Sequence, residues 1–299
     1  MLEGFISKIQ RYSTKDGPGV RSTVFAIGCN LGCLWCANPE LIADATQFLY
    51  HPQRCVKCGA CVAQSDGGIS FTEQGIEIDR SVVDFEKAYL ACYYDAYEKI
   101  GTRISSSDLA DELLRDKVFF DQSGGGVTYS GGEAAMQAEF FKEVTYYLKK
   151  TNVHVALDTA GYLPWSKLAS IADDVDLVLY DIKTLDGTLH KRYTGVDNRL
   201  ILENAVKLAN TGKPMIVRLI LIPGVNDTED EIVGRLKFVK QLRADIRVDF
   251  LKYHKLGAGK YASLGMTEMM GETEECSDEL TDFAMNVAQE MGISATIGG

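Results

Sequence analysis

The sequence lacks the basic surface that a nucleic-acid-binding protein needs. Acidic side chains outnumber basic ones by 42 to 31, which gives a net charge of −11 at pH 7. Contact with a phosphate backbone requires clustered Lys and Arg side chains, and no run of these residues occurs in the chain. The composition therefore argues against nucleic acid as a main partner.

Long apolar runs are also missing. Residues 1–8 contain no basic segment that leads into a long apolar stretch, so we expect no secretory signal. The most apolar segment, residues 215–223, is short and is interrupted by Arg218, which indicates a buried strand and not a membrane span. We expect a soluble cytoplasmic protein with no membrane contact.

The eight cysteines are placed unevenly. Seven lie within the first 92 residues, six of these form two tight groups, and Cys276 stands alone. In an intracellular chain, tight groups of cysteines favour metal binding over disulfides. Cys276 is expected to be a buried small residue, because a free cysteine behaves as a small hydrophobe.

The pattern of apolar residues predicts an α/β fold. Residues 20–29 form a strand candidate, and after residue 100 strand candidates alternate with amphipathic segments. These further candidates are residues 126–130, 154–159, 177–182, 216–222 and 248–253. Strands that are each followed by a helix imply a parallel sheet with right-handed crossovers. Six units fall short of the eight of a closed barrel, so we expect an open, partial (β/α)6 barrel.

Three segments carry helix signals. Apolar residues recur at helical spacing within residues 136–148 and again within 280–291. Thr228 and Glu231 form a capping-box pattern, which marks the start of a third helix.

Residues 46–100 break the alternation of strands and helices. They contain three cysteines within seven residues, several glycine turns and a predicted helix over residues 83–100. We interpret them as an insertion with its own metal site. The chain is thus divided into the start of the barrel at 1–45, the insertion at 46–100 and the remainder of the barrel at 101–299.

Polar residues stand at or just beyond the C-terminal ends of the six predicted strands. They are Cys29, Glu133, Asp158, Asp181, Arg218 and His254. In parallel α/β architectures this edge of the sheet is where ligands bind. One polar residue at a strand end can be accidental, but one in each of six units indicates a site.

Cys29, Cys33 and Cys36 form the pattern CxxxCxxC. Thiolates favour iron–sulfur clusters or zinc. A [4Fe–4S] cluster held by only three cysteines keeps one iron open, which is what a reactive metal site requires. The alternative is a zinc site that takes a fourth ligand from elsewhere, although paired zinc ligands more often show CxxC spacing.

Cys55, Cys58 and Cys61 form the pattern CxxCxxC, as in bacterial ferredoxins. The fourth ferredoxin cysteine is missing, because Ser65 and Asp66 stand where it would be expected. The nearest remaining thiol belongs to Cys92, which gives one auxiliary [4Fe–4S] cluster with four ligands. A structural zinc on the same four thiols is the alternative.

The residues around the first cysteine group resemble a known family. The run Cys29-Asn-Leu-Gly-Cys-Leu-Trp-Cys36 is similar to the signature of the radical S-adenosylmethionine (SAM) superfamily. The flanking segments Asp-Gly-Pro-Gly at 16–19 and Ala-Asn-Pro-Glu at 37–40 resemble the enzymes of that superfamily that activate glycyl radical enzymes. Many members of this family resemble a two-cluster ferredoxin in the insertion, whereas this chain has ligands for only one auxiliary cluster.

Later motifs match the family in order, and the resemblance implies a role for each. The segment at 130–133 resembles the GGE motif, in which Gly131, Gly132 and Glu133 hold the amino group of SAM. The segments at 158–161 and 181–183 resemble the DTxG and DxK motifs. The cofactor-binding residues implied are Trp35, Gly131, Gly132, Glu133, Asp158, Thr159, Asp181, Lys183, Arg218 and His254. Lys183 and Arg218 would offset the SAM carboxylate, and His254 would lie near the nucleoside.

The resemblance also implies a cation and a reaction. Asp158, Thr159 and Asp181 would hold Na⁺ or K⁺ beside SAM. The SAM cluster would cleave SAM reductively to methionine and a 5′-deoxyadenosyl radical, which removes hydrogen from a glycine Cα of a partner glycyl radical enzyme. Asp16, counted with Cys29, Cys33 and Cys36 among the catalytic residues, would contact the incoming glycine loop.

The implied partners are a glycyl radical enzyme and a low-potential electron donor such as flavodoxin or ferredoxin. The chain contains no glycyl radical segment of the type R-V-x-G-Y, so its substrate is another chain or a small molecule. A dehydratase such as 4-hydroxyproline or glycerol dehydratase is the favoured client. The alternatives are a radical SAM enzyme that acts on a small molecule or ribosomal peptide, and an iron–sulfur electron carrier, which would not need the three SAM motifs.

Overall fold

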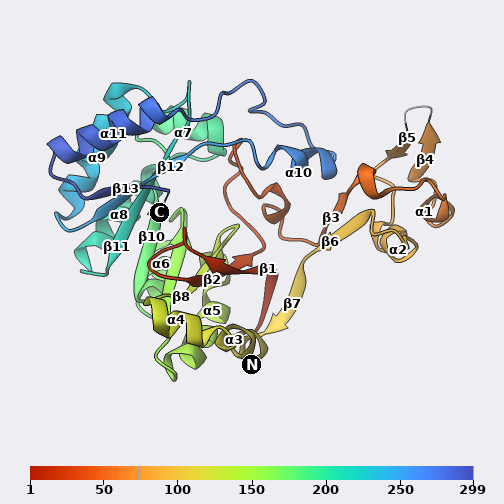
Figure 1. The fold of residues 1–299 in the computed structure, drawn as a ribbon, viewed down its shortest axis with the longest axis horizontal. Helices are drawn as coiled ribbons and strands as arrows, with labels where there is room; N and C mark the ends of the chain where they lie inside the picture. The colour runs from red at the N-terminus through yellow and green to blue at the C-terminus, as the bar shows by residue number, and fades with distance from the viewer. Residues whose placement is uncertain (73–74, 299) are drawn as a thin grey trace.

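The computed structural model describes residues 1–72 and 75–298. Figure 1 shows one large sheet with helices packed against it and a small lobe set to one side. The sheet has nine strands in the order β13-β12-β11-β10-β9-β8-β2-β1-β7. This arrangement confirms the predicted α/β class.

The six strands predicted from the sequence are all present. They are β2 (Arg21–Ala26), β8 (Gly126–Gly131), β9 (His154–Thr159), β10 (Leu177–Asp181), β11 (Met215–Leu221) and β12 (Arg247–Lys252). They lie side by side in chain order, and each pairs in parallel with the next. Their C-terminal ends therefore meet at one edge of the sheet, as the sequence predicts.

Three further strands extend the sheet at its two sides and were not predicted. Strand β13 (Ala295–Ile297) pairs in parallel with β12. On the other side, β1 (Glu3–Ser13) pairs antiparallel with β2, and β7 (Thr102–Ser105) pairs antiparallel with β1. The sheet is thus mixed but mostly parallel. Strands β13 and β7 stand at the two ends of the strand order, and no pairing between them is found in the described residues.

The chain forms helices between and after these strands, and most of them pack against the large sheet (Figure 1). They are α3 (Ser106–Leu114), α4 (Lys117–Ser123), α5 (Ala138–Lys149), α6 (Trp165–Ala172), α7 (Gly187–Thr194), α8 (Arg199–Asn210), α9 (Glu229–Leu242), α10 (Ala258–Ser263) and α11 (Asp278–Glu290). The two predicted apolar helix faces lie in α5 and α11, and both contribute to the largest apolar core. A short 3₁₀ helix, η3 (Ala134–Gln137), leads into α5.

The predicted capping box at the start of α9 is half formed. The Thr228 side chain accepts a hydrogen bond from the Glu231 backbone N–H at 3.3 Å. The Glu231 carboxylate does not return to Thr228. It accepts from the Leu185 backbone N–H at 3.0 Å, which ties α9 to the loop after β10.

The inner face of the sheet has an apolar layer beneath a polar one. Ala156, Leu177, Leu179 and Ile216 form a separate buried cluster. Residues two apart on a strand share a face, so Asp158, Asp181 and Arg218 follow Ala156, Leu179 and Ile216 on the same side. The strands thereby lift three charged side chains above an apolar floor at the C-terminal edge.

Among the described residues of the segment 46–100, none belongs to a strand of the large sheet. Strands β3 (Gln47–Tyr50) and β6 (Tyr97–Ile100) form one antiparallel pair, and β4 (Ile69–Thr72) and β5 (Gly75–Ile78) form another. The other elements around this part are η1 (Pro39–Leu41), η2 (Pro52–Arg54), α1 (Ala60–Ala63) and α2 (Phe85–Leu90). We call residues 46–100 the small lobe; it has a core of its own around Cys61, Ile69, Ala88, Ala96 and Tyr97.

The predicted helix over residues 83–100 is wrong in its extent. Helix α2 starts after Asp84, whose side chain caps the Lys87 N–H at 3.1 Å, and it ends at Leu90. Asp95 has a left-handed φ of 51°, which no helix accommodates, and the chain then pairs with β3 as a strand. Cys92 therefore lies in the turn after α2 and not on a helix.

Within the ranges that the structure covers, no helix is both long and apolar enough to cross a membrane.

Arg235 on α9 ties together the loops that follow two neighbouring strands. Its side chain is fully buried, and its guanidinium donates to the backbone carbonyls of Ile220 at 2.9 Å and Asn226 at 2.7 Å. The Asn226 side chain in turn donates to the Lys183 carbonyl at 2.6 Å. The loops after β10 and β11 are thus fixed to α9 by buried hydrogen bonds.

We expect Arg235→Met to lower the free energy of unfolding by about 3 kcal/mol, because the carbonyls of Ile220 and Asn226 each lose a charged donor. Urea unfolding of the metal-free protein measures this. Lys237→Met, on the exposed side of the same helix, is the matched control and should change stability by less than about 0.5 kcal/mol. Equal effects of the two variants would contradict the role of Arg235.

Candidate functional site

A cavity of about 620 Å³ opens at the C-terminal edge of the parallel strands. Twelve of the residues that the sequence analysis picked out line it. They are Cys29, Cys33, Trp35, Cys36, Gly131, Gly132, Asp158, Thr159, Asp181, Lys183, Arg218 and His254. The fold thus gathers side chains from six strand-to-helix units around one space.

The loop that carries the three cysteines is held by backbone hydrogen bonds. This cysteine loop (residues 29–36) follows β2. The Gly32 N–H donates to the Thr194 carbonyl at 2.8 Å and the Leu34 N–H donates to the Tyr193 carbonyl at 2.9 Å, so the loop is fixed to the end of α7. The Trp35 ring lies 5.9 Å from that of Tyr193.

Helix α10 fastens the far end of the cysteine loop. Lys260 donates to the Asn38 side chain at 2.7 Å and to the Glu40 carboxylate at 2.6 Å. The Tyr261 hydroxyl donates to the Cys36 carbonyl at 3.1 Å. Helix α10 lies between the large sheet and the small lobe in Figure 1, and Arg80 of the lobe donates to the Ser263 carbonyl at 2.6 Å.

The glycines at the end of β8 are required by the close passage of the chain. A Cβ on Gly131 would lie 2.3 Å from the Ala26 nitrogen, and one on Gly132 would lie 2.3 Å from the Gly28 carbonyl oxygen. Gly131 also has a φ of 111°, which side chains disfavour. These two glycines therefore let the end of β8 pass directly beside the start of the cysteine loop.

Burial keeps the three thiols protonated when nothing is bound. It raises the pKa of Cys29 to about 12 and that of Cys36 to about 11, and it also raises the pKa of Cys33. Lys183 partly offsets this rise at Cys33. Thiolates would therefore form here only with a strongly cationic ligand, such as a metal centre.

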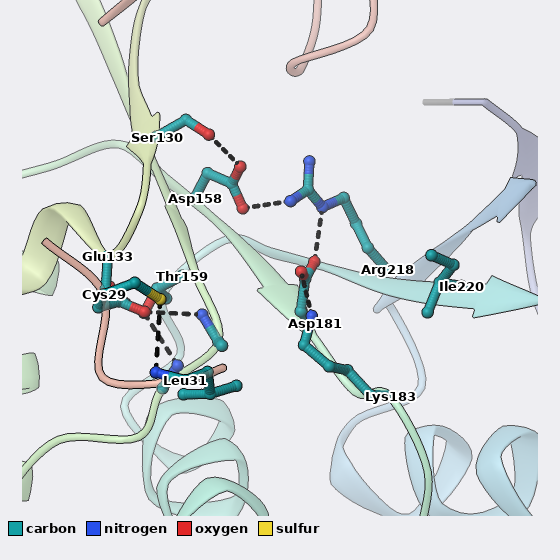
Figure 2. Close-up of polar contacts among 12 residues, drawn as sticks. Cys29, Leu31, Ser130, Glu133, Asp158, Thr159, Asp181, Lys183, Arg218 and Ile220 are labelled. Carbon is teal, nitrogen blue, oxygen red and sulfur yellow. Dashed lines mark hydrogen bonds and ion pairs between the residues drawn. The ribbon is translucent and has the colours of Figure 1, made fainter. Parts of the chain in front are cut away.

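Arg218 connects two carboxylates on neighbouring strands. Its Nε donates to Asp181 at 2.8 Å and its Nη2 is paired with Asp158. Ser130 donates to the other Asp158 oxygen at 2.5 Å, and Lys183 lies 3.2 Å from Asp181. Figure 2 shows Arg218 between the two carboxylates with Nη1 directed away from both. Two positive charges thus balance two negative ones.

The two carboxyl groups differ in their pKa because their partners differ. Burial alone would raise the pKa of Asp181, but Arg218 and Lys183 outweigh this and hold it below its usual range. Burial raises the pKa of Asp158, and Arg218 offsets the rise only in part. Both aspartates also support the charge on Arg218, whose pKa is raised against the effect of burial.

Glu133 is buried behind the cavity and does not line it. Its carboxylate accepts hydrogen bonds from the Thr159 hydroxyl at 2.8 Å and from the backbone N–H groups of Ala160 at 3.0 Å and Ala135 at 3.1 Å. Burial raises its pKa to about 7. The side chain joins the segment after β8 to the segment after β9, as Figure 2 shows.

The residues predicted to hold Na⁺ or K⁺ are engaged with other groups. Thr159 donates to Glu133, and Asp158 and Asp181 both pair with Arg218. In the described part of the chain, no three His, Cys, Asp or Glu side chains converge on a position for one metal ion. The cation thus stays a prediction from the resemblance.

Asp16 and His254 lie differently with respect to the cavity. The Asp16 carboxylate accepts from the hydroxyls of Ser13 at 2.5 Å and Thr23 at 2.6 Å, and its neighbour Lys15 lines the cavity instead. His254 lines the cavity with an exposed side chain.

Several cavity residues were not predicted from the sequence. Ser130 holds Asp158, and Ile220 supplies an apolar wall. Ser130 lies two residues before Gly132, just inside the end of β8, and Ile220 lies two residues after Arg218 on β11, so strand alternation could have found them. Lys15 and the segment at 297–298 come from distant parts of the chain, and no local pattern marks them.

A second, smaller pocket lies in the small lobe. It is lined by Cys55, Cys58, Cys61 and Cys92, together with Tyr97 and other apolar neighbours. Ser65, at the position of the missing ferredoxin cysteine, is buried; its hydroxyl donates to Val62 at 2.9 Å and accepts from Ile69 at 3.0 Å. Ser65 therefore closes a turn and does not face the pocket.

Comparison with known proteins places these features in a family. The family model described as "Radical SAM superfamily" matches residues 23–236. The trans-4-hydroxy-L-proline dehydratase activating enzyme of Clostridioides difficile is 36% identical over the full length of both chains. The choline trimethylamine-lyase activating enzyme of Oleidesulfovibrio alaskensis is 36% identical over 88% of this chain and 87% of its own.

The fold is similar to that of a radical SAM methyltransferase from Sphaerobacter thermophilus, with a TM-score of 0.55 over 98% of this chain and 76% of that chain. At 13% identity this likeness concerns the fold alone. The sheet is accordingly consistent with a radical SAM partial barrel. The near full-length identity to activating enzymes and the match to the superfamily model show that the chain belongs to the radical SAM superfamily and, within it, to the enzymes that activate glycyl radical enzymes.

Proposed function

We propose that this activating enzyme binds its SAM cluster at Cys29, Cys33 and Cys36 and receives the glycine loop of its client at the cavity beside them. The observation that carries the proposal is that one cavity brings together three thiols on one loop and the Arg218 bridge. Membership of the superfamily implies a [4Fe–4S] cluster, and three soft donors that leave one iron open fit it.

The cofactors supply the one-electron cleavage of the sulfonium carbon–sulfur bond and thereby the power to remove a hydrogen atom. The chain supplies charge and orientation. Arg218 uses Nε and Nη2 for the two aspartates, and no hydrogen bond in the described residues uses Nη1. We assign that group, with Lys183, to the SAM carboxylate.

The remaining cofactor-binding roles follow from position. The backbone of Gly131 and Gly132 borders the cavity beside the cysteine loop, so its carbonyls can accept from the SAM ammonium. Glu133 does not line the cavity and has a positioning role, because its carboxylate already accepts hydrogen bonds from Thr159 and Ala160. Trp35 and His254 at the cavity wall are assigned to the nucleoside side.

We propose that the small lobe is a ferredoxin-like insertion with one auxiliary [4Fe–4S] cluster on Cys55, Cys58, Cys61 and Cys92. The four thiols line one pocket, which suits a thiolate-bound cluster. A low-potential flavodoxin or ferredoxin is the proposed electron donor. Since Ser65 is committed to a turn, the lobe has ligands for one cluster.

The client is a glycyl radical enzyme, and we favour a dehydratase such as 4-hydroxyproline or glycerol dehydratase. The names of the two similar activating enzymes point to a dehydratase and to a lyase, at the same identity of 36%. Sequence identity therefore does not choose between these client chemistries. A panel of purified clients decides it.

Replacing Cys29, Cys33 and Cys36 together by Ala should reduce iron and sulfide from about eight to about four of each per chain, at four per cluster. SAM cleavage should be lost. Elemental analysis of anaerobically purified protein measures the metal content. Cys276→Ala, which removes a buried thiol that lines neither pocket, is the control and should keep eight. Stoichiometric zinc without sulfide would contradict both cluster assignments.

Cys92→Ala should make the auxiliary cluster labile while the SAM cluster and SAM binding are retained, because it removes one of four thiols from the small-lobe pocket. Iron analysis together with SAM-dependent changes in the electron paramagnetic resonance (EPR) spectrum separates the two clusters. If Cys276→Ala had this effect and Cys92→Ala did not, the fourth ligand would be assigned to the wrong thiol.

With client, SAM and a strong reductant, the enzyme should produce a glycine-centred radical on the client, and deuterium at that glycine Cα should appear in 5′-deoxyadenosine. We expect Asp16→Ala to reduce this transfer at least tenfold with SAM binding retained, because Asp16 orders the turn next to Lys15 at the cavity. Thr14→Ala, exposed on the same turn, is the control. Label arriving only from a small metabolite would overturn the client assignment.

A further inference from the structure

Tyr97 places a hydroxyl group inside the small-lobe pocket with nothing to bond to. The residue is 3% exposed, lies on β6 and lines the pocket together with the four cysteines. Within the described part of the chain, its hydroxyl oxygen makes no hydrogen bond of normal geometry. A buried hydroxyl without a partner costs about 1–3 kcal/mol, so this arrangement calls for a missing acceptor.

The groups beside the hydroxyl identify that acceptor. Tyr97 and Cys61 belong to one buried cluster and line the same pocket, and the hydroxyl lies against the Cys61 thiol, with Tyr50 and Cys55 also close by. A neutral thiol is a weak acceptor, whereas a metal-bound thiolate carries negative charge and accepts well. The orphaned hydroxyl therefore fits a pocket whose cysteines are thiolates on a metal centre.

The strand pair β3–β6 fixes this hydroxyl rigidly. Tyr50 and Tyr97 are paired residues in the antiparallel register, and their rings lie 5.3 Å apart. Tyr50 makes the same type of contact with the Cys55 thiol. Phe85 packs edge-on against Tyr97 at 6.5 Å. The ring of Tyr97 thus has little freedom to turn its hydroxyl elsewhere.

The hydroxyl can act as a donor. An ordinary tyrosine hydroxyl is protonated at neutral pH, so Tyr97 has a hydrogen to donate.

We infer that the Tyr97 hydroxyl donates a hydrogen bond to the Cys61 sulfur of the auxiliary cluster and raises the reduction potential of that cluster. The inference rests on the proposed auxiliary cluster. Hydrogen bonds to cluster sulfurs are among the factors that set the potential. Reduction adds one electron to the cluster, and a donor at sulfur stabilises the more negative, reduced form more than the oxidised one.

The same contact has opposite consequences with and without the cluster. In the metal-free protein the hydroxyl is an unsatisfied polar group, so its removal should not destabilise the fold. In the loaded protein its removal deletes a charge-assisted hydrogen bond. A residue that only packs would not show this reversal, and Tyr97→Phe leaves the ring and its packing in place.

The test compares Tyr97→Phe with Tyr93→Phe in the full chain. Tyr93 directly follows Cys92 and is 89% exposed, so its hydroxyl is in water. The auxiliary potential is measured by EPR-monitored titration with dithionite and mediators, in protein reconstituted with iron and sulfide. We expect Tyr97→Phe to disfavour reduction about tenfold, a shift of 59 mV to lower potential for one electron. Tyr93→Phe should leave the potential unchanged, and the metal-free stability of Tyr97→Phe should equal or exceed that of the wild type.

Iron content separates the possible failures. If the wild type holds about eight iron and Tyr97→Phe has an unchanged or higher potential, the inference about Tyr97 is wrong and the auxiliary cluster stands. If the wild type holds only about four iron, or zinc in the second pocket, the auxiliary cluster and the role of Tyr97 both fall. If Tyr93→Phe lowers the potential as much as Tyr97→Phe, the shift does not come from the Cys61 contact.

Discussion

The pairing of Arg218 with Asp158 and Asp181 is the interaction on which the cavity depends. Three neighbouring parallel strands each bring one charge to the same edge, above an apolar layer that cannot solvate them. Removing one partner of such a buried group costs about 3–5 kcal/mol, because a charge is left without compensation. The bridge therefore holds β9, β10 and β11 in one register at the site. Both carboxylates are engaged by it, while one guanidinium nitrogen of Arg218 points away from both of them (Figure 2).

The surroundings of the bridge are fixed by contacts from outside the strands. Glu133 joins the segments after β8 and β9, and Arg235 joins the loops after β10 and β11. Helix α10 holds the cysteine loop through Lys260 and is itself bonded to Arg80 of the small lobe. The cavity is thus preorganised by side-chain hydrogen bonds, which is what the binding of a reactive cofactor requires.

Much of the fold and of the cavity lining could be predicted because short-range sequence patterns determine it. The six parallel strands and the helices α5 and α11 follow apolar periodicity, and the strand-end residues follow from the parallel arrangement. The edge strands β1 and β7 were missed because their pairing involves residues about 100 positions apart. The helix predicted over 83–100 failed at Asp95, where a left-handed residue and pairing with β3 outweigh local helix propensity. The family motifs picked out residues that line the cavity, but they did not indicate that Glu133 does not line it or that Lys15 does. Because the chain belongs to the activating enzymes, that function is a better interpretation than an iron–sulfur electron carrier or a radical SAM enzyme for small molecules.

The two thiol pockets differ in size and polarity, in line with the different tasks proposed for them. The first is large, open and edged with charged groups, so a cluster there can meet a charged cofactor and a client peptide. The second is small and mostly apolar, with tyrosines against two of its thiols and no room beside them for a substrate. Low polarity around a cluster disfavours the extra negative charge of reduction, and phenol donors counteract that effect. An apolar pocket that carries its own hydrogen-bond donors suits a centre that exchanges electrons and binds nothing else.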